Sequence, residues 1–399
     1  MPLAARGLAI VANAPRDMLS NIPSELFDVI VEAVILREEP PPADIATAAA
    51  NRREEAIHKS FYEAKVVTQR GPIVSNSAGL LRSNRALAGR TREVLQRLRA
   101  SPSGLSLKLD ILIVGERELW STWTHVPDLQ RPITKLDVQI RIADGHTIGR
   151  QNGWNTASTG PPALIYCFYF LLSAFLRRGP NFDELHKPWW GETAPSVSVV
   201  DHEVIVHALN VDVSALDDSK VVPDAMDDEW SAARPRQRHG DDLEIEVDDA
   251  TRRLCELCMR PERLARHLNG SFGFSYMLGM YQPEYGTILY ERLGGMTMSI
   301  RGTVWRTFDI GASFAGLVQR PNDPNEYYRP KSDFFMRGPA KEQSARFAVW
   351  WYATRARRLR LGLPGGDATD EDADIPSLEE AQATLLPLHD NITVGQESG

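Results

Sequence analysis

Apolar residues near the start of the chain recur with the period of an α-helix. Between residues 19 and 36 they fall on one helical stripe. Pro23 suits a first helical turn, where a missing N–H costs nothing, so we expect this helix to begin near Ile22. Residues 78–99 repeat the pattern, with leucines on one face and arginines on the other. The sequence therefore predicts two amphipathic helices in this part of the chain.

The two helices are separated by residues 37–72, which we interpret as an insertion. Pro40 to Pro42 end the first helix, because proline cannot continue the helical hydrogen-bond ladder. Residues 45–65 are alanine-rich and polar, with little apolar moment, and we expect them to form a polar helix.

Beyond residue 100 the period of the apolar residues changes to two, which is typical of strands. Residues 105–113 and 136–142 alternate apolar and polar side chains, and residues 116–123 between them are expected to form a short helix that ends at Val126-Pro127. Further along, we expect strands at 204–213 and 296–308 and helices at 163–176, 250–268 and 340–361.

Strands separated by helical stretches predict a mixed α/β (α+β) fold. Because the strand spacings are unequal, the body is at most an irregular relative of a leucine-rich horseshoe. The expected organisation is a flexible N-terminus (1–18), a helical segment with its insertion (19–100), an α/β body (101–362) with an acidic mobile loop at 217–249, and a disordered acidic C-terminal tail (363–399).

Charge and cysteine content narrow the classes of partner. The formal net charge is −8, so nucleic acid and anionic lipid are not favoured as partners by the molecule as a whole. The apolar run at 163–176 is shorter than the ~20 residues of a membrane-spanning helix. Three cysteines form no disulfide framework, and no secretory signal is evident, so we expect a cytoplasmic or nuclear protein.

The arginines at 355–360 suit a helix C-terminus, and the acidic tail after them offers a second way to neutralise their charge.

Candidate chemistry is sparse. Cys255 and Cys258 with His267 have a zinc-like spacing, but they fall within an expected helix and have no second Cys-x-x-Cys, so we interpret them as packing residues. Phosphate-binding loops and a nucleophile elbow are missing from the sequence. The sequence thus predicts a non-catalytic protein without metal or cofactor.

The segment Ile22-Pro23-Ser24-Glu25-Leu26 resembles the start of an F-box, in which a Leu-Pro-x-Glu-Leu pattern opens the first helix. Residues 80–95 are similar to the later part of that domain. The chain is also similar to fungal F-box-domain proteins at 109–127, 163–180 and 285–291, so the resemblance extends over most of residues 19–318. The insertion at residues 37–72 is a departure from the F-box, which is a compact unit of three helices.

The resemblance implies a substrate-recruiting subunit of a cullin-type ubiquitin ligase, which docks on a Skp-type adaptor and holds an unknown protein substrate with its body. Two alternatives remain open: the apolar stripe packs on the chain's own body, or the chain is a scaffold that kept the fold and lost the docking. Carried over by position, the adaptor-binding residues are Ile22, Pro23, Leu26, Ile30, Val34, Leu81 and Leu87.

Overall fold

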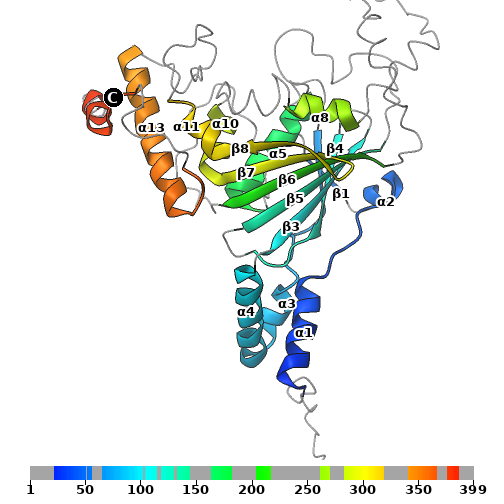
Figure 1. Ribbon diagram of the computed structural model, residues 1–399. Coiled ribbons are helices and arrows are strands. Elements are labelled where there is room, and N and C mark those ends of the chain that lie inside the picture. The colour runs from blue at the N-terminus through cyan, green and yellow to red at the C-terminus, as the bar shows by residue number, and fades with distance from the viewer. Residues whose placement is uncertain are drawn as a thin grey trace, which may run out of the picture.

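A computed structural model gives the chain a mixed α/β architecture with a helical unit projecting from one side of a large sheet (Figure 1). The structure describes residues 22–50, 52–55, 65–101, 104–114, 118–129, 133–143, 163–181, 204–216, 261–269, 283–318, 340–365 and 375–385. The expected flexible N-terminus, the acidic loop 217–249 and the first part of the helix expected from residue 250 lie outside these residues.

One eight-stranded sheet forms the centre of the molecule, in the order β1-β2-β4-β3-β5-β6-β7-β8. β3, β5, β6 and β7 run parallel to one another, and β2 runs parallel to β4. The pairs β1–β2, β3–β4 and β7–β8 are antiparallel. The strands are β1 (Arg52–Glu55), β2 (Lys65–Gln69), β3 (Ser106–Val114), β4 (Glu118–His125), β5 (Ile133–Ile142), β6 (Val206–Ala215), β7 (Leu293–Ile300) and β8 (Thr303–Asp309).

This topology excludes the leucine-rich horseshoe. Stacked repeats contact only their neighbours in the chain, so their strands follow one another in order. Here β4 lies between β2 and β3, and three strand pairs are antiparallel. The mixed α/β class is confirmed, and the horseshoe alternative is wrong.

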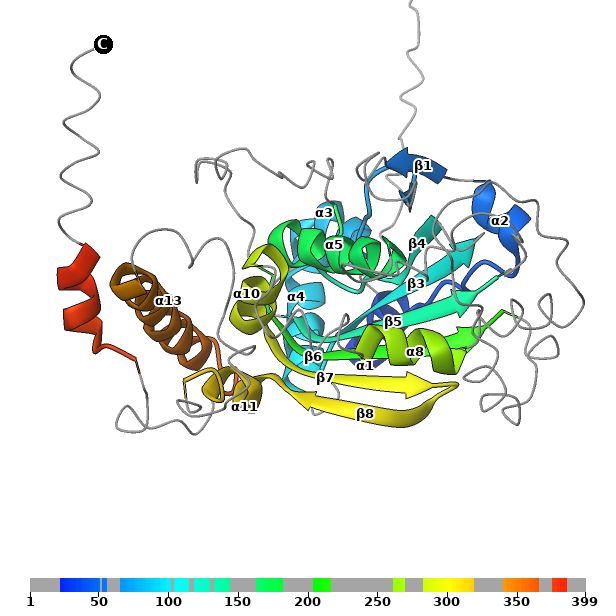
Figure 2. The same cartoon turned by 90° about the horizontal axis from the view of Figure 1, so that it is seen from above.

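Helices cover the apolar face of the sheet. α5 (Ala163–Arg178), α8 (Pro261–Asn269) and α10 (Pro283–Arg292) lie over it when the molecule is seen from above (Figure 2). The alternating strands supply that face with buried residues such as Val138 and Val211. Because α5 is apolar along most of its length, it can pack both on this face and against α10.

The opposite face of the sheet is polar. Asp137 and Asn210 are neighbours on β5 and β6, and the Asn210 amide donates to the Asp137 carboxylate at 2.7 Å. Gln139 on the same face is exposed. Parallel strands covered on both faces are apolar almost throughout, so the polar alternation itself indicates a sheet with helices on one side.

A second group of helices packs beyond β7 and β8. α11 (Ile310–Ala315) and α13 (Ala340–Arg360) meet through Phe314 and Trp351, whose rings stack with centroids 5.5 Å apart. Arg358 is buried and donates to the Leu293 carbonyl at 2.8 Å and to the Tyr290 carbonyl, so a cation satisfies backbone oxygens at the end of α10. Burial lowers the pKa of Arg358 to about 10.

The segment expected to be an insertion is part of the sheet. Residues 45–65 form the short helix α2 (Ile45–Ala49) and lead through β1 to β2, in place of one polar helix. Val66 and Val67 are buried, and β2 pairs with β4, a strand that lies some 50 residues further along the chain. The helix predicted for residues 45–65 is therefore wrong. The local sequence does not indicate that this segment pairs with so distant a strand.

One other local prediction is wrong, and two are borne out only in part. Of the residues 116–123 expected to be helical, the described ones (118–123) belong to strand β4, where Trp and Thr suit a pleated surface. The helix expected at 78–99 is broken at Asn84, which is extended and caps the second part by accepting from the Leu87 N–H at 2.9 Å. The strand expected at 296–308 is a hairpin, turned by Arg301 and Gly302 at positive φ.

The prediction that the whole tail is disordered is wrong for part of it. Residues 378–385 are helical, and residues 375–385 pack against α13. Elsewhere in the described residues, α5, β3, β5, β6 and α13 lie where the sequence pattern predicts helices and strands.

Phe175 tests the packing of α5 on the sheet. It is 1% exposed and its ring lies 5.2 Å from that of Trp123, so Phe175→Ala is expected to lower the free energy of unfolding by about 3–5 kcal/mol. Gln139→Ala, on the open face, is expected to change it by less than about 0.5 kcal/mol. Urea denaturation measures both, and equal effects would contradict this account of the two faces.

Candidate functional site

The first helix, α1 (Ser24–Ile35), carries apolar side chains on two sides. Phe27, Val31 and Ile35 are at most 4% exposed. Leu26 is 59% exposed and Ile30 46%. We name the exposed set, which also includes Val29 and Val34, the α1 outer face.

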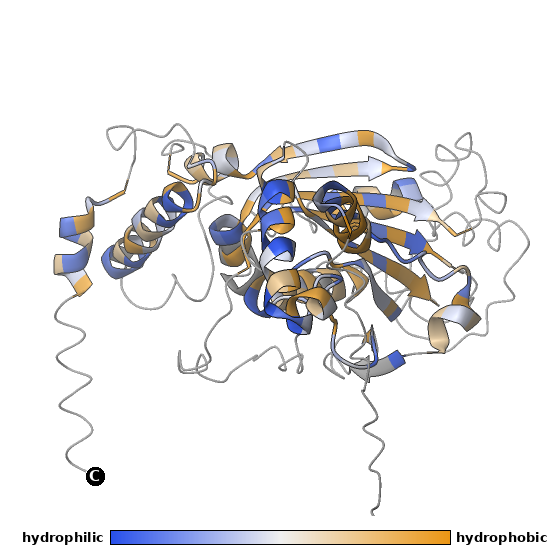
Figure 3. Ribbon diagram, turned by 90° about the horizontal axis from the view of Figure 1, so that it is seen from below, coloured by the Kyte–Doolittle hydropathy of each residue, from blue (hydrophilic) through white to orange (hydrophobic). Residues whose placement is uncertain are grey.

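The buried side of α1 packs on α4 (Arg85–Ala100). Phe27, Val31 and Ile35 form one cluster with the α4 residues Val94 and Leu95. This cluster is separate from the core under the sheet, and α3 (Ala78–Ser83) contributes half-buried leucines to its edge. The helices α1, α3 and α4 therefore form a unit with its own core, which projects toward the viewer in Figure 3.

A third side of α1 carries acidic residues that pair with an arginine of α4. Asp28 and Glu32 accept from the Arg97 guanidinium at 3.0 and 3.1 Å. The Arg90 guanidinium lies 4.2 Å from the centre of the Phe27 ring, within reach of a cation–π interaction. Because the acidic side and the buried side both face α4, the outer face is directed away from it.

The chain between α1 and α2 ties the helical unit to the polar face of the sheet. The Asn76 amide donates to the carbonyls of Ile35 (2.9 Å) and Arg37 (2.7 Å). The Arg37 carbonyl also accepts from His125 Nδ1 at 2.9 Å. The Arg141 guanidinium donates to the Pro42 carbonyl at 2.8 Å. Backbone groups of this segment thus bond to side chains of β4 and β5.

A buried ion pair lies beneath the segment. Arg141 Nε and Nη2 donate to the two carboxylate oxygens of Asp110 at 2.6 and 2.8 Å. Arg141 is 8% exposed and Asp110 is 2% exposed, so water hardly reaches either charge and each one compensates the other. The two-pronged contact orients the guanidinium toward Pro42.

The structure divides the seven predicted docking residues into three groups. Leu26, Ile30, Val34 and Pro23 are exposed. Ile22 and Leu81 are half-buried against the α1–α4 cluster. Leu87 departs from the prediction, because it is 8% exposed and packs inside the same cluster. Burial of Leu87 follows from helix packing, which the sequence pattern alone does not specify.

One exposed residue was missed. Val29 is 63% exposed and belongs to the outer face, although the F-box pattern does not single it out. The sequence offered one signal for Val29: it is an apolar residue in a helix that has apolar residues on most of its sides, more than one interface can bury.

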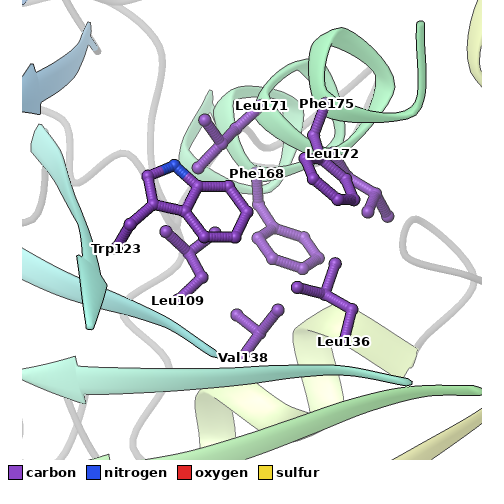
Figure 4. A pocket seen from close by; sticks show the side chains of 8 residues that line it. All are labelled: Leu109, Trp123, Leu136, Val138, Phe168, Leu171, Leu172 and Phe175. Carbon is purple, nitrogen blue, oxygen red and sulfur yellow. The ribbon is translucent and has the colours of Figure 1, made fainter. Parts of the chain in front are cut away.

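The body offers no comparable site for chemistry among the residues that the structure describes. A cavity of about 10 Å³ between α5 and the sheet is lined only by apolar and aromatic side chains (Figure 4). That volume holds about one water molecule at most. Cys167 is buried, which raises the pKa of its thiol to about 12 and leaves it protonated at neutral pH.

Within the described ranges, no group of three or more His, Cys, Asp or Glu side chains is placed to hold a metal ion. Cys255, Cys258 and the side chain of His267 lie outside the described residues. A search of the described helices finds none that is long and apolar enough to cross a membrane.

Comparison with known proteins gives no assignment: no family model, curated protein or solved structure significantly matches this chain. The geometry of the α1 outer face is therefore the basis for its functional interpretation.

The burial of His125, which contacts the Arg37 carbonyl, makes the stability of the chain sensitive to pH. Burial lowers the pKa of His125 below its ordinary value of about 6.5, despite the opposing effects of the Arg37 carbonyl, Glu38 and Asp137; nearby Lys108 lowers it further. Below that value the unfolded chain takes up a proton that the folded chain resists, so the free energy of unfolding falls as the pH drops from 7.5 to 5.5.

His125→Asn keeps a donor near the position of Nδ1 and removes the titration. We expect the free energy of unfolding of this variant, measured by urea denaturation at both pH values, to fall less than that of the unaltered chain. Equal pH dependence of the two proteins would contradict the assignment.

The ion pair under the segment gives a second test. Arg141→Ala leaves the Asp110 carboxylate buried without its partner, and we expect a loss of about 3–5 kcal/mol in the free energy of unfolding. Lys135→Ala on the same strand removes only a half-exposed ion pair with Asp137 and is expected to cost at most about 1 kcal/mol. Comparable losses in the two variants, measured by urea denaturation, would refute the role of Arg141.

Proposed function

We propose that this chain is a non-catalytic, F-box-like adaptor whose α1 outer face docks on a Skp-type adaptor protein, while the α/β body recruits a protein substrate for a cullin-type ubiquitin ligase. The observation that carries the proposal is the exposure of Leu26 and Ile30 on a helix whose opposite side is fully packed.

The exposed residues have the spacing expected of a helix that binds in a groove. Leu26, Ile30 and Val34 are separated by four residues, and Val29 lies beside them, so they form one stripe about two turns long. Fully burying an aliphatic side chain of this size contributes about 1.5–3 kcal/mol. Because these side chains are 38–63% exposed, a partner that covers the stripe gains part of that contribution from each of them, and contacts around the stripe add to it.

The location of the insertion supports the F-box comparison. Residues 37–72 leave the helical unit, add β1 and β2 to the edge of the sheet, and return to α3. The chain thereby gathers α1, α3 and α4 into one compact unit although they are not consecutive. A long insertion is thus compatible with an F-box-like helical unit.

A scaffold without ligase docking is the second candidate. The burial of Leu87 favours the scaffold. Without Leu87, the exposed apolar residues of the predicted docking set lie mainly on α1, so the second helix contributes little to docking. In that case the outer face binds a protein other than a Skp-type adaptor.

Leu26→Asp in the full chain tests the proposal. A charge at the N-terminal end of the stripe, which a bound partner would cover, is expected to weaken binding to a purified Skp-type adaptor at least about tenfold. Val304→Asp on β8 is the matched control, since Val304 is also an exposed apolar residue (63%) but lies on the far edge of the sheet. Isothermal titration calorimetry measures both, and denaturation checks that neither variant is unfolded.

The outcomes separate the two candidates. Loss of binding in Leu26→Asp with full binding in Val304→Asp supports the adaptor. No binding by the unaltered chain, or equal binding by both variants, removes the adaptor proposal and leaves the scaffold.

A further inference from the structure

A short helix from the acidic tail is seated on α13. Residues 378–385 are helical and lie beside α13 near the marked C-terminus (Figure 1). Ala381, at the centre of the contact, is 0% exposed. Ala383, two residues further on, is exposed. The tail helix therefore has one buried side and one free side.

The part of α13 beneath the tail helix is built from small residues. Ala345 and Ala348 are at most 1% exposed and form one cluster with Ala381. Alanine at all three positions lets the two backbones approach closely. Half-buried apolar residues surround the contact: Val349 and Tyr352 on α13, and Ile375 and Leu385 on the tail. We name Ala345, Ala348, Val349 and Tyr352 the α13 face.

The tail helix carries its own start signal. The Ser377 hydroxyl accepts from the Glu380 N–H at 3.3 Å, and the Glu380 carboxylate accepts from the Ser377 N–H at 3.0 Å. These reciprocal bonds form a capping box, which satisfies N–H groups at the helix N-terminus. A sequence expected to be disordered is therefore prepared to become helical when a surface is available.

The helix is too short to be stable without that surface. The described part of the helix is eight residues long, and Pro387 in the sequence is unfavourable inside a helix, so the segment is shorter than the roughly 12–15 residues that an isolated helix needs in water. Its ordering is thus coupled to docking on α13. The two segments carry net charges of opposite sign: residues 375–385 contain two glutamates and no lysine or arginine, whereas α13 contains six lysines and arginines against one glutamate. Arg346, Arg357 and Arg358 of α13 contact Glu342, Glu291 and backbone carbonyls rather than residues 375–385 of the tail.

We propose that the α13 face is a binding site for a short, acidic, N-capped helix with a small residue at its centre, and that the chain's own residues 375–385 occupy it reversibly. The tail acts as an intramolecular competitor, and a partner helix of the same chemistry binds when it displaces the tail. This site is independent of the docking face on α1.

Hydrogen exchange in the full chain tests the seating of the tail. We expect the amides of residues 382–385 to exchange slowly, with protection lost in Ala381→Glu and retained in Ala383→Glu. The two variants place the same charge on the same helix, one on the buried side and one on the free side. Unprotected amides in the unaltered chain, or equal protection in both variants, would overturn the proposal.

A labelled peptide of residues 375–385 tests whether the site accepts a helix in trans. We expect saturable binding to the full-length Ala381→Glu chain, whose own tail is displaced, by fluorescence anisotropy. Binding to the unaltered chain is expected to be at least about tenfold weaker, because a tethered tail competes at an effective concentration on the order of 1 mM.

Two altered peptides complete the test. Ser377→Ala removes the hydroxyl of the capping box, and binding is expected to weaken about fivefold, whereas Ser377→Asp retains an N-cap acceptor and is expected to bind as the native peptide does. Absence of binding to the Ala381→Glu chain, equal affinity for both chains, or undiminished binding of a peptide that itself carries Ala381→Glu would each refute a reversible site.

Discussion

The packing of α1 on α4 is the contact on which the interpretation of this molecule depends. α1 has more apolar side chains than one interface can bury. Phe27, Val31 and Ile35 are covered by α4, and Asp28 and Glu32 turn a second side toward its arginines. The remaining apolar side is left to the solvent. A different rotation of α1 would hide the outer face and expose the residues that now form the core of the helical unit.

The sheet holds this unit through one short segment. The carbonyl of Arg37 accepts from His125 and Asn76, and that of Pro42 accepts from Arg141, which is itself held by Asp110. These are polar contacts on the face of the sheet that lacks covering helices. The body therefore uses its apolar face for its own core and part of its polar face for attaching the helical unit. Covalent continuity alone would not orient α1.

Some of the fold could be read from local pattern. The alternation of apolar and polar residues in β5, β6 and the first part of β3, and the long apolar run of α5, have one physical interpretation each, and all four elements were predicted. The pattern failed where distant segments decide the outcome. Val66 and Val67 form a strand because β4 pairs with them, and Ala381 becomes helical because α13 lies beneath it. In the candidate site, Leu26 and Ile30 were named as docking residues, while packing of their stripe on the chain's own body was left open as an alternative, and the burial of Leu87 was not foreseen.

The sequence by itself determined which segments are amphipathic, that the sheet has one apolar and one polar face, and that the first helix has a surplus of apolar residues. These properties follow from the order of side chains along a helix or strand. Only the tertiary structure decided which apolar side of α1 is covered, that residues 37–72 join the sheet, and that part of the tail is seated on α13. Those outcomes depend on which surfaces meet, and that is set by contacts between residues far apart in the chain.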